Sequence, residues 1–148
     1  MAKTFWALLG AGGMALAGCS DRATDAISTP WRNDTAAMGW DLVSLFADDP
    51  ERGSREWTHV YRGAEFRFHT EANRDLFALN PEAFLPEYGG YCAWAVAHDK
   101  LARGNPEYST MLDGRLYFNF NDRTHRLWEK DYKAWLAKSE RYWPGVLG

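Results

Sequence analysis

The chain has 148 residues, and its 17 basic and 20 acidic side chains give a net charge of −3. This length suits a single domain with a real hydrophobic core, and no basic patch supports a role in nucleic-acid binding. Aromatic residues make up 16% of the chain, which predicts a core built largely from rings.

The first nineteen residues have the pattern of an exported lipoprotein leader. Lys3 precedes a short apolar run over residues 5–16, and residues 16–19 read Leu-Ala-Gly-Cys. The run is too short to span a bilayer, and a charged start with a small-residue end is typical of a secretory signal peptide. The last four residues resemble a bacterial lipobox, which implies cleavage after Gly18 and lipidation of Cys19. The alternative is an ordinary signal peptide with a chance cysteine.

The leader divides the chain into three predicted parts. Residues 1–18 are the signal peptide, and residues 19–37, which are mostly polar or small, form a lipidated N-terminus and flexible tether. The folded domain is expected over residues 38–148. Several acyl chains give stable membrane attachment, so we expect a protein anchored by lipid to a membrane of the bacterial cell envelope and facing the periplasm.

The first half of the predicted domain contains a hairpin followed by a helix. Aromatic residues alternate through residues 57–68, on both sides of a turn at Arg62-Gly63. This period of two is typical of half-buried strands. Thr70 can cap a helix, and Pro81 ends it.

The second half repeats this arrangement. Asp113-Gly114 is a strong hairpin turn signal, and Leu116, Phe118 and Phe120 fall on one strand face. Asn121 or Asp122 can cap one long helix, whose apolar residues are spaced by three and four. These apolar residues are Leu127, Trp128, Tyr132, Trp135 and Leu136.

The two halves align when one is shifted by 51 residues. The shift matches Gly63 with Gly114 and Phe77 with Trp128. It is compatible with an ancient duplication, although two unrelated hairpin–helix units would show the same turn and cap residues. Either way, the sequence predicts an α+β fold. We expect one small domain with two β-hairpin–helix units around a short helix that follows a Gly-Gly-Tyr-Cys segment, residues 89–92.

The segment between the units contains the main candidate site. Tyr88, Tyr91 and Trp94 surround Cys92, which is the only thiol left free once Cys19 is lipidated. An unpaired cysteine in an exported protein is buried, metal-bound or paired with another molecule. One interpretation is therefore a packed core with an inert thiol. The other is a shallow aromatic pocket lined by Tyr88, Tyr91, Cys92 and Trp94.

Metal binding and catalysis have thinner support. Cys92 is a candidate ligand for copper or another soft metal, and Met38 and Met111 could add thioethers. The four histidines lack the paired spacing of strong metal sites. They are His59, His69, His98 and His125. The sequence has no phosphate-binding loop, His-Glu-x-x-His or Gly-x-Ser-x-Gly motif, so a non-catalytic protein is expected.

Several stretches carry a family resemblance. They are residues 39–46, residues 66–68 with 73–75 and 77, residues 88–96, residues 104–107 followed by 113–117, and residues 128–131. In this order they resemble the YHS domain in its stand-alone exported form. The resemblance implies a small α+β domain of the bacterial envelope. Other branches of that family occur on metal-transporting ATPases and bind soft metals through cysteines, but the matching early region, residues 41–45, has no cysteine here.

Together these features predict a lipid-anchored, non-catalytic accessory module that binds a small ligand or a protein partner. The alternative is a soft-metal binding or relay protein that uses Cys92.

Overall fold

The structure is a computed structural model that describes residues 26–30 and 32–148. The predicted signal peptide and Cys19 lie outside the described residues. Among the residues described, no helix is both long and apolar enough to cross a membrane.

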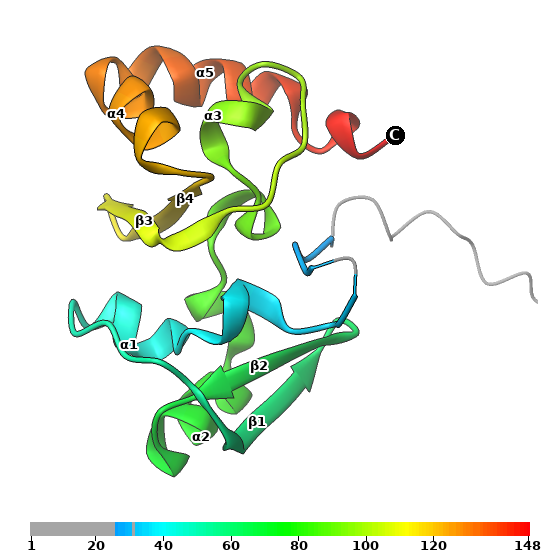
Figure 1. The fold of residues 1–148 in the computed structure, drawn as a ribbon, viewed down its shortest axis with the longest axis vertical. Helices are drawn as coiled ribbons and strands as arrows, with labels where there is room; N and C mark the ends of the chain where they lie inside the picture. The colour runs from blue at the N-terminus through cyan, green and yellow to red at the C-terminus, as the bar shows by residue number, and fades with distance from the viewer. Residues whose placement is uncertain (1–25, 31) are drawn as a thin grey trace, which may run out of the picture.

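The first unit consists of an antiparallel hairpin with short helices packed against it (Figure 1). Strand β1 (Ser54–Tyr61) pairs with β2 (Ala64–Phe68), and helix α2 (Glu71–Leu79) follows. The hairpin is preceded by the 3-10 helix η1 (Ala36–Gly39) and helix α1 (Leu42–Phe46), and the unit ends with η2 (Pro81–Phe84).

The second unit has the same order of elements. The 3-10 helix η3 (Glu87–Gly90) and helix α3 (Ala93–Val96) precede the antiparallel pair β3 (Asn105–Leu112) and β4 (Arg115–Asn119). Helices α4 (Asp122–Lys130) and α5 (Tyr132–Tyr142) follow, and η4 (Gly145–Leu147) ends the chain. The predicted α+β class is confirmed.

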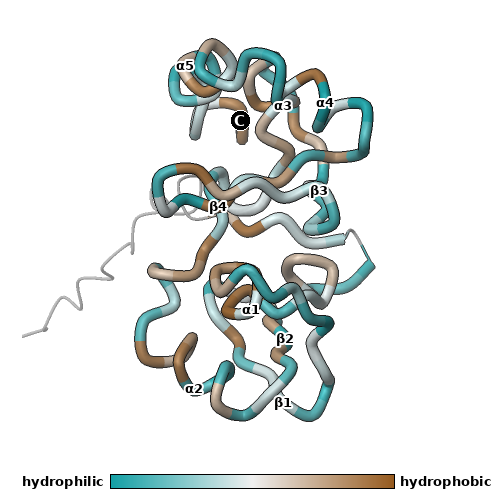
Figure 2. Tube along the Cα trace, turned by 90° about the vertical axis from the view of Figure 1, so that its left-hand side faces the viewer, coloured by the Kyte–Doolittle hydropathy of each residue, from teal (hydrophilic) through white to brown (hydrophobic). Residues whose placement is uncertain are grey.

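Each unit has its own aromatic centre, and Figure 2 shows the two units stacked one above the other. In the first, Phe77 is fully buried and its ring lies 4.7 Å from that of Phe66. In the second, Trp128 is fully buried and its ring lies 5.5 Å from that of Tyr117. Phe77 and Trp128 are partners at the 51-residue shift, so the same structural position anchors both cores.

Backbone hydrogen bonds repeat at the same shift. The amide of Asp41 donates to the carbonyl of Glu51 at 3.0 Å, and the amide of Cys92 donates to the carbonyl of Ala102 at 2.8 Å. The strand registers repeat too, with matching irregularities after the first pair of each hairpin, Ser54–Phe68 and Asn105–Asn119. The shift therefore describes one backbone geometry used twice, and not only similar turn residues.

The single long helix predicted after the second hairpin is wrong. Asp131 leaves helical geometry (φ −153°, ψ 52°) and separates α4 from α5. This break lies at the position that matches Asn80 (φ −153°, ψ 80°), where α2 ends. It allows α5 to fold back onto α3, and the hydroxyl of Ser139 donates to the carbonyl of Ala93 at 2.9 Å in the buried interior.

The described part of the predicted flexible tether is packed against the fold. The amide of Ser28 donates to the carbonyl of Gly89 at 2.8 Å, and the amide of Glu65 donates to the carbonyl of Asp34 at 2.7 Å. A Cβ at Gly89 would lie 1.8 Å from the carbonyl oxygen of Ala26, so only glycine permits this approach. The folded unit thus begins before residue 38, because backbone groups outside the predicted domain complete its hydrogen bonds.

Candidate functional site

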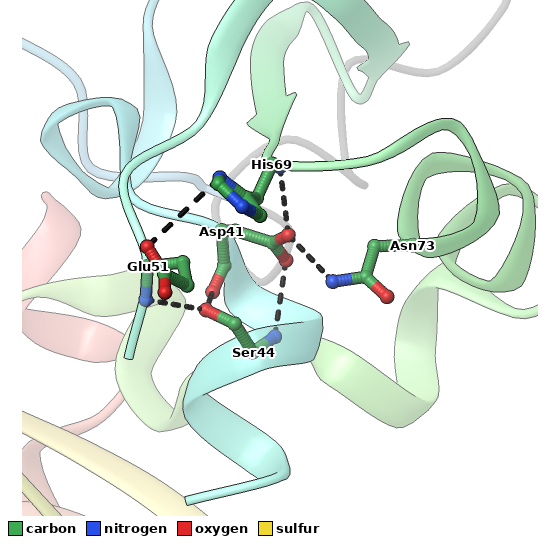
Figure 3. A network of polar contacts seen from close by, with 5 residues as sticks. All are labelled: Asp41, Ser44, Glu51, His69 and Asn73. Atoms are coloured by element: carbon green, nitrogen blue, oxygen red, sulfur yellow. Dashed lines mark hydrogen bonds and ion pairs between the residues drawn. The ribbon is translucent and has the colours of Figure 1, made fainter. Parts of the chain in front are cut away.

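A buried carboxylate organises the first unit, together with four polar neighbours (Figure 3). Asp41 is fully buried and caps α1, where its Oδ1 accepts a hydrogen bond from the amide of Ser44 at 3.1 Å. Its Oδ2 accepts from the amide of His69 at 2.8 Å and from Nδ2 of Asn73 at 2.7 Å. Because the carboxylate has donors on both oxygens, its burial is compensated.

The Ser44 hydroxyl extends these contacts. It donates to the carbonyl of Asp41 at 2.7 Å and accepts from the amide of Glu51 at 2.9 Å. The Glu51 carboxylate in turn lies 3.9 Å from Nδ1 of His69. We refer to Asp41, Ser44, Glu51, His69 and Asn73 as the Asp41 network. Its polar groups bond mainly to one another, which indicates a structural role.

The matching five positions of the second unit form a cavity instead. Shifting the Asp41 network by 51 residues gives Cys92, Ala95, Ala102, Phe120 and Thr124. All five line one cavity of about 290 Å³, which is also lined by Trp94, His98, Lys100 and Leu101. We refer to this space as the Cys92 cavity.

The residue changes explain why the space is open. Ser44 and Glu51 of the first unit correspond to Ala95 and Ala102 in the second, and these alanine side chains are too short to reach across the space. Two apolar lining residues, Leu101 and Phe120, are 42% and 45% exposed, and the charged lining residue Lys100 is exposed as well. The predicted strand face shared by Phe118 and Phe120 is wrong for Phe120, because β4 ends at Asn119 and Phe120 lines the cavity instead.

Cys92 itself is fully buried and occupies the N-cap position of α3, where, unlike Asp41, its side chain makes no capping hydrogen bond. Its Sγ donates to Oδ1 of Asn119 at 3.6 Å, and the same oxygen accepts from the amide of Trp94 at 3.3 Å. Burial raises the pKa of the thiol, and this effect outweighs nearby donors such as the amide of Ala95 and the hydroxyl of Thr124. The thiol is therefore the favoured form at neutral pH, which makes Cys92 a poor nucleophile.

His98 joins the cavity wall through an aromatic stack. Its Nδ1 lies 2.7 Å from the carbonyl oxygen of Trp94, which can only accept, so Nδ1 carries the hydrogen. The ring lies 3.9 Å from that of Trp94 and 5.1 Å from that of Trp135. Helix α3 ends at Val96, and the chain then turns so that His98 lines the same cavity as Cys92.

The four predicted pocket residues do not share one cavity. Cys92 and Trp94 line the Cys92 cavity, whereas Tyr88 lines a separate hollow next to Trp143. The rings of Tyr88 and Tyr91 pack 5.7 Å and 6.1 Å from that of Trp143. The reason is local backbone geometry: Tyr88 and the two glycines after it have positive φ, which turns the tyrosines toward the C-terminal segment.

The candidate metal ligands are mostly dispersed. His59 packs on Phe77, His69 belongs to the Asp41 network, and Nε2 of His125 lies 3.2 Å from the carboxylate of Glu129. Met111 is 39% exposed, and Met38 lines a hollow other than the Cys92 cavity. Within residues 26–30 and 32–148, no group of three or more histidine, cysteine, aspartate and glutamate side chains is placed to hold a metal ion.

Comparison with known proteins adds no assignment. The chain matches no protein-family model, no curated protein and no solved structure. The resemblance to the YHS domain therefore stays a prediction.

Proposed function

We propose that the protein is a lipid-anchored, non-catalytic binding module of the bacterial cell envelope that holds a small, mainly apolar ligand in the Cys92 cavity. One observation carries the proposal: where the first unit has a polar network, the second has an open space lined by five replaced residues. A folded chain gains nothing in stability from leaving such a space unfilled.

The size and lining of the cavity suggest the class of ligand. A volume of about 290 Å³ lies just below the usual range of ligand sites, which starts near roughly 300 Å³, and suits a molecule with one or two rings. Trp94, Leu101 and Phe120 offer apolar contacts, whereas the fully buried Cys92 contributes no solvent-accessible surface. His98 and Lys100 are the polar groups that would orient a polar end of the ligand.

The soft-metal alternative has less support. The polar atom bonded to the Cys92 sulfur is an amide oxygen of Asn119, at 3.6 Å, and oxygen is not a preferred ligand of Cu(I). A raised pKa also opposes formation of the thiolate that binds metal.

The anchor is supported by the sequence of the leader alone, which combines Lys3, the apolar run over residues 5–16 and the Leu-Ala-Gly-Cys segment. We expect Cys19→Ala to abolish labelling by a radioactive fatty acid, because that cysteine is the proposed acylation site. Unchanged labelling of this variant would contradict the anchor and leave the cavity proposal intact.

The cavity proposal is tested with indole as a probe of suitable size. We expect saturation-transfer NMR to show indole binding to the full chain, and Ala102→Leu to abolish it by filling the cavity. The matched control is Glu51→Leu, the same position in the first unit, which should leave binding unchanged. Equal indole binding by the wild type and Ala102→Leu would refute the proposal.

A further inference from the structure

A second hollow, on another part of the surface, is lined by three arginines. Arg55 lies in β1, Arg67 in β2, and Arg103 in the loop before β3, so both units contribute. The hollow has a volume of about 230 Å³ and is also lined by Asn33 and Thr35. None of its described lining residues is acidic.

Among the residues that the structure describes, one of the three guanidinium groups has a protein partner. Nε of Arg67 lies 2.7 Å from a carboxylate oxygen of Glu65, and its Nη2 donates to the hydroxyl of Thr35 at 3.2 Å. Within the described part of the chain, the side chains of Arg55 and Arg103 form no ion pair or hydrogen bond. The hollow therefore holds surplus positive charge in a protein whose net charge is −3.

Polar donors complement this charge. Oδ1 of Asn33 accepts from the amide of Thr35 at 3.0 Å, which leaves the Asn33 NH₂ group as a donor. The Thr35 hydroxyl accepts from Arg67 and keeps its own hydrogen to donate. Two unpaired guanidinium groups and two neutral donors around one hollow match the acceptor oxygens of a tetrahedral anion.

We propose that this hollow binds a phosphate group, with Arg55 and Arg103 as its main ligands and Arg67 held in place by Glu65 and Thr35. The group is either free, as inorganic phosphate, or part of an anionic lipid headgroup. The site differs from the Cys92 cavity in its residues and in the charge of its ligand, so it does not depend on the function proposed above.

The experiment is isothermal titration calorimetry of the full chain in a nonionic detergent at constant ionic strength. One arm uses sodium phosphate, and the other uses soluble dihexanoyl phosphatidylglycerol with dihexanoyl phosphatidylcholine as the zwitterionic comparison. We expect saturable binding in at least one arm. Binding of inorganic phosphate identifies the free anion as sufficient, whereas binding of phosphatidylglycerol alone identifies the lipid headgroup as the source.

The test variant is Arg55→Gln combined with Arg103→Gln. We expect at least a tenfold loss of affinity, with an unchanged melting temperature, because neither side chain has an internal partner. The control combines Arg123→Gln with Arg141→Gln, two exposed arginines outside the hollow, and should bind like the wild type. No saturable binding in either arm, or equal affinity in the wild type and the test variant, overturns the proposal.

Discussion

The Asp41 network and the Cys92 cavity occupy the same place in two copies of one backbone arrangement. In the first unit a buried carboxylate accepts hydrogen bonds from Ser44, His69 and Asn73. In the second unit a thiol takes its place, and smaller or apolar side chains leave about 290 Å³ open. The comparison shows that one backbone arrangement can enclose a filled polar network in one unit and an open, mainly apolar space in the other.

The chemistry of the capping residue explains the difference. A buried carboxylate requires donors on its oxygens, so the residues around Asp41 are constrained to be polar. A thiol is a weak donor and acceptor and behaves as a small hydrophobic group, so Cys92 needs few partners. Its neighbours Ala95 and Ala102 are accordingly free of that constraint.

The largest expected effect tests whether the two aromatic cores contribute equally to stability. Phe77→Ala and Trp128→Ala remove the matched, fully buried ring of each core. We expect each to lower the free energy of unfolding by about 3–5 kcal/mol, as is usual for large buried aromatics. Urea denaturation measures this, and a loss below about 1 kcal/mol in either variant would show that the two cores are not equivalent.

The two N-cap residues, Asp41 and Cys92, should differ more in their contribution to stability than the two core rings do. Asp41→Ala leaves three donors without their acceptor and is expected to cost about 2–4 kcal/mol. Cys92→Ala removes one sulfur beside an existing cavity and should cost about 1 kcal/mol. The same denaturation experiment compares them, and equal losses would mean that the thiol is as strongly integrated as the carboxylate.

A reciprocal exchange of one hydroxyl sharpens the comparison further. Ser44→Ala removes one buried and one partly buried hydrogen bond and should cost about 1–2 kcal/mol. At the matched position, Ala95→Ser offers the same hydroxyl to the carbonyl of Cys92 and should change stability by less than about 1 kcal/mol. A large destabilisation by Ala95→Ser would contradict the inferred equivalence of the two backbones.

The smallest expected effect concerns Glu87, which stands where the first unit has the buried Ala36. Burial raises the pKa of the Glu87 carboxyl, although Arg115 partly opposes this. The folded state therefore holds the proton more tightly than the unfolded state, and stability falls as pH rises from the unfolded pKa through the folded one.

We therefore expect Glu87→Gln to have a slightly higher melting temperature than the wild type at pH 7. At pH 3 the two melting temperatures should be equal. Thermal denaturation at both pH values measures the difference. The control is Glu56→Gln, because Glu56 is an exposed glutamate in β1. This variant should have the wild-type melting temperature at both pH values. A lower melting temperature for Glu87→Gln at pH 7 would indicate that attraction to Arg115 dominates over burial.

Local features of the fold could be predicted because their signals lie within a few residues. The hydroxyl of Thr70 accepts from the amide of Asn73 at 3.1 Å, which confirms the predicted cap of α2. Of the two candidates for the cap of α4, Asn121 or Asp122, it is Asn121 whose Oδ1 accepts from the amide of Thr124 at 2.9 Å. Both hairpin turns also lie where their glycines indicated.

The cavity could not be predicted from the same signals, because its lining comes from residues 92–124 and depends on side chains that are too short to meet. The informative signal is the 51-residue shift, which also holds before residue 63. The shift pairs Asp41 with Cys92, and it pairs Ser44 and Glu51 with Ala95 and Ala102. It also predicts the break between α4 and α5, since Asp131 matches the residue at which α2 ends.

The packed segment before η1 has a mechanical consequence. Ser28 is hydrogen-bonded to Gly89 of the second unit, whereas Asp34 is hydrogen-bonded to Glu65 of the first. This N-terminal segment therefore connects the two units. A pulling force applied at residue 26 loads the contact with Gly89 before the contact with Glu65. Tension from the N-terminal side would therefore detach this segment from the second unit first, while its hydrogen bond to the first unit is still intact.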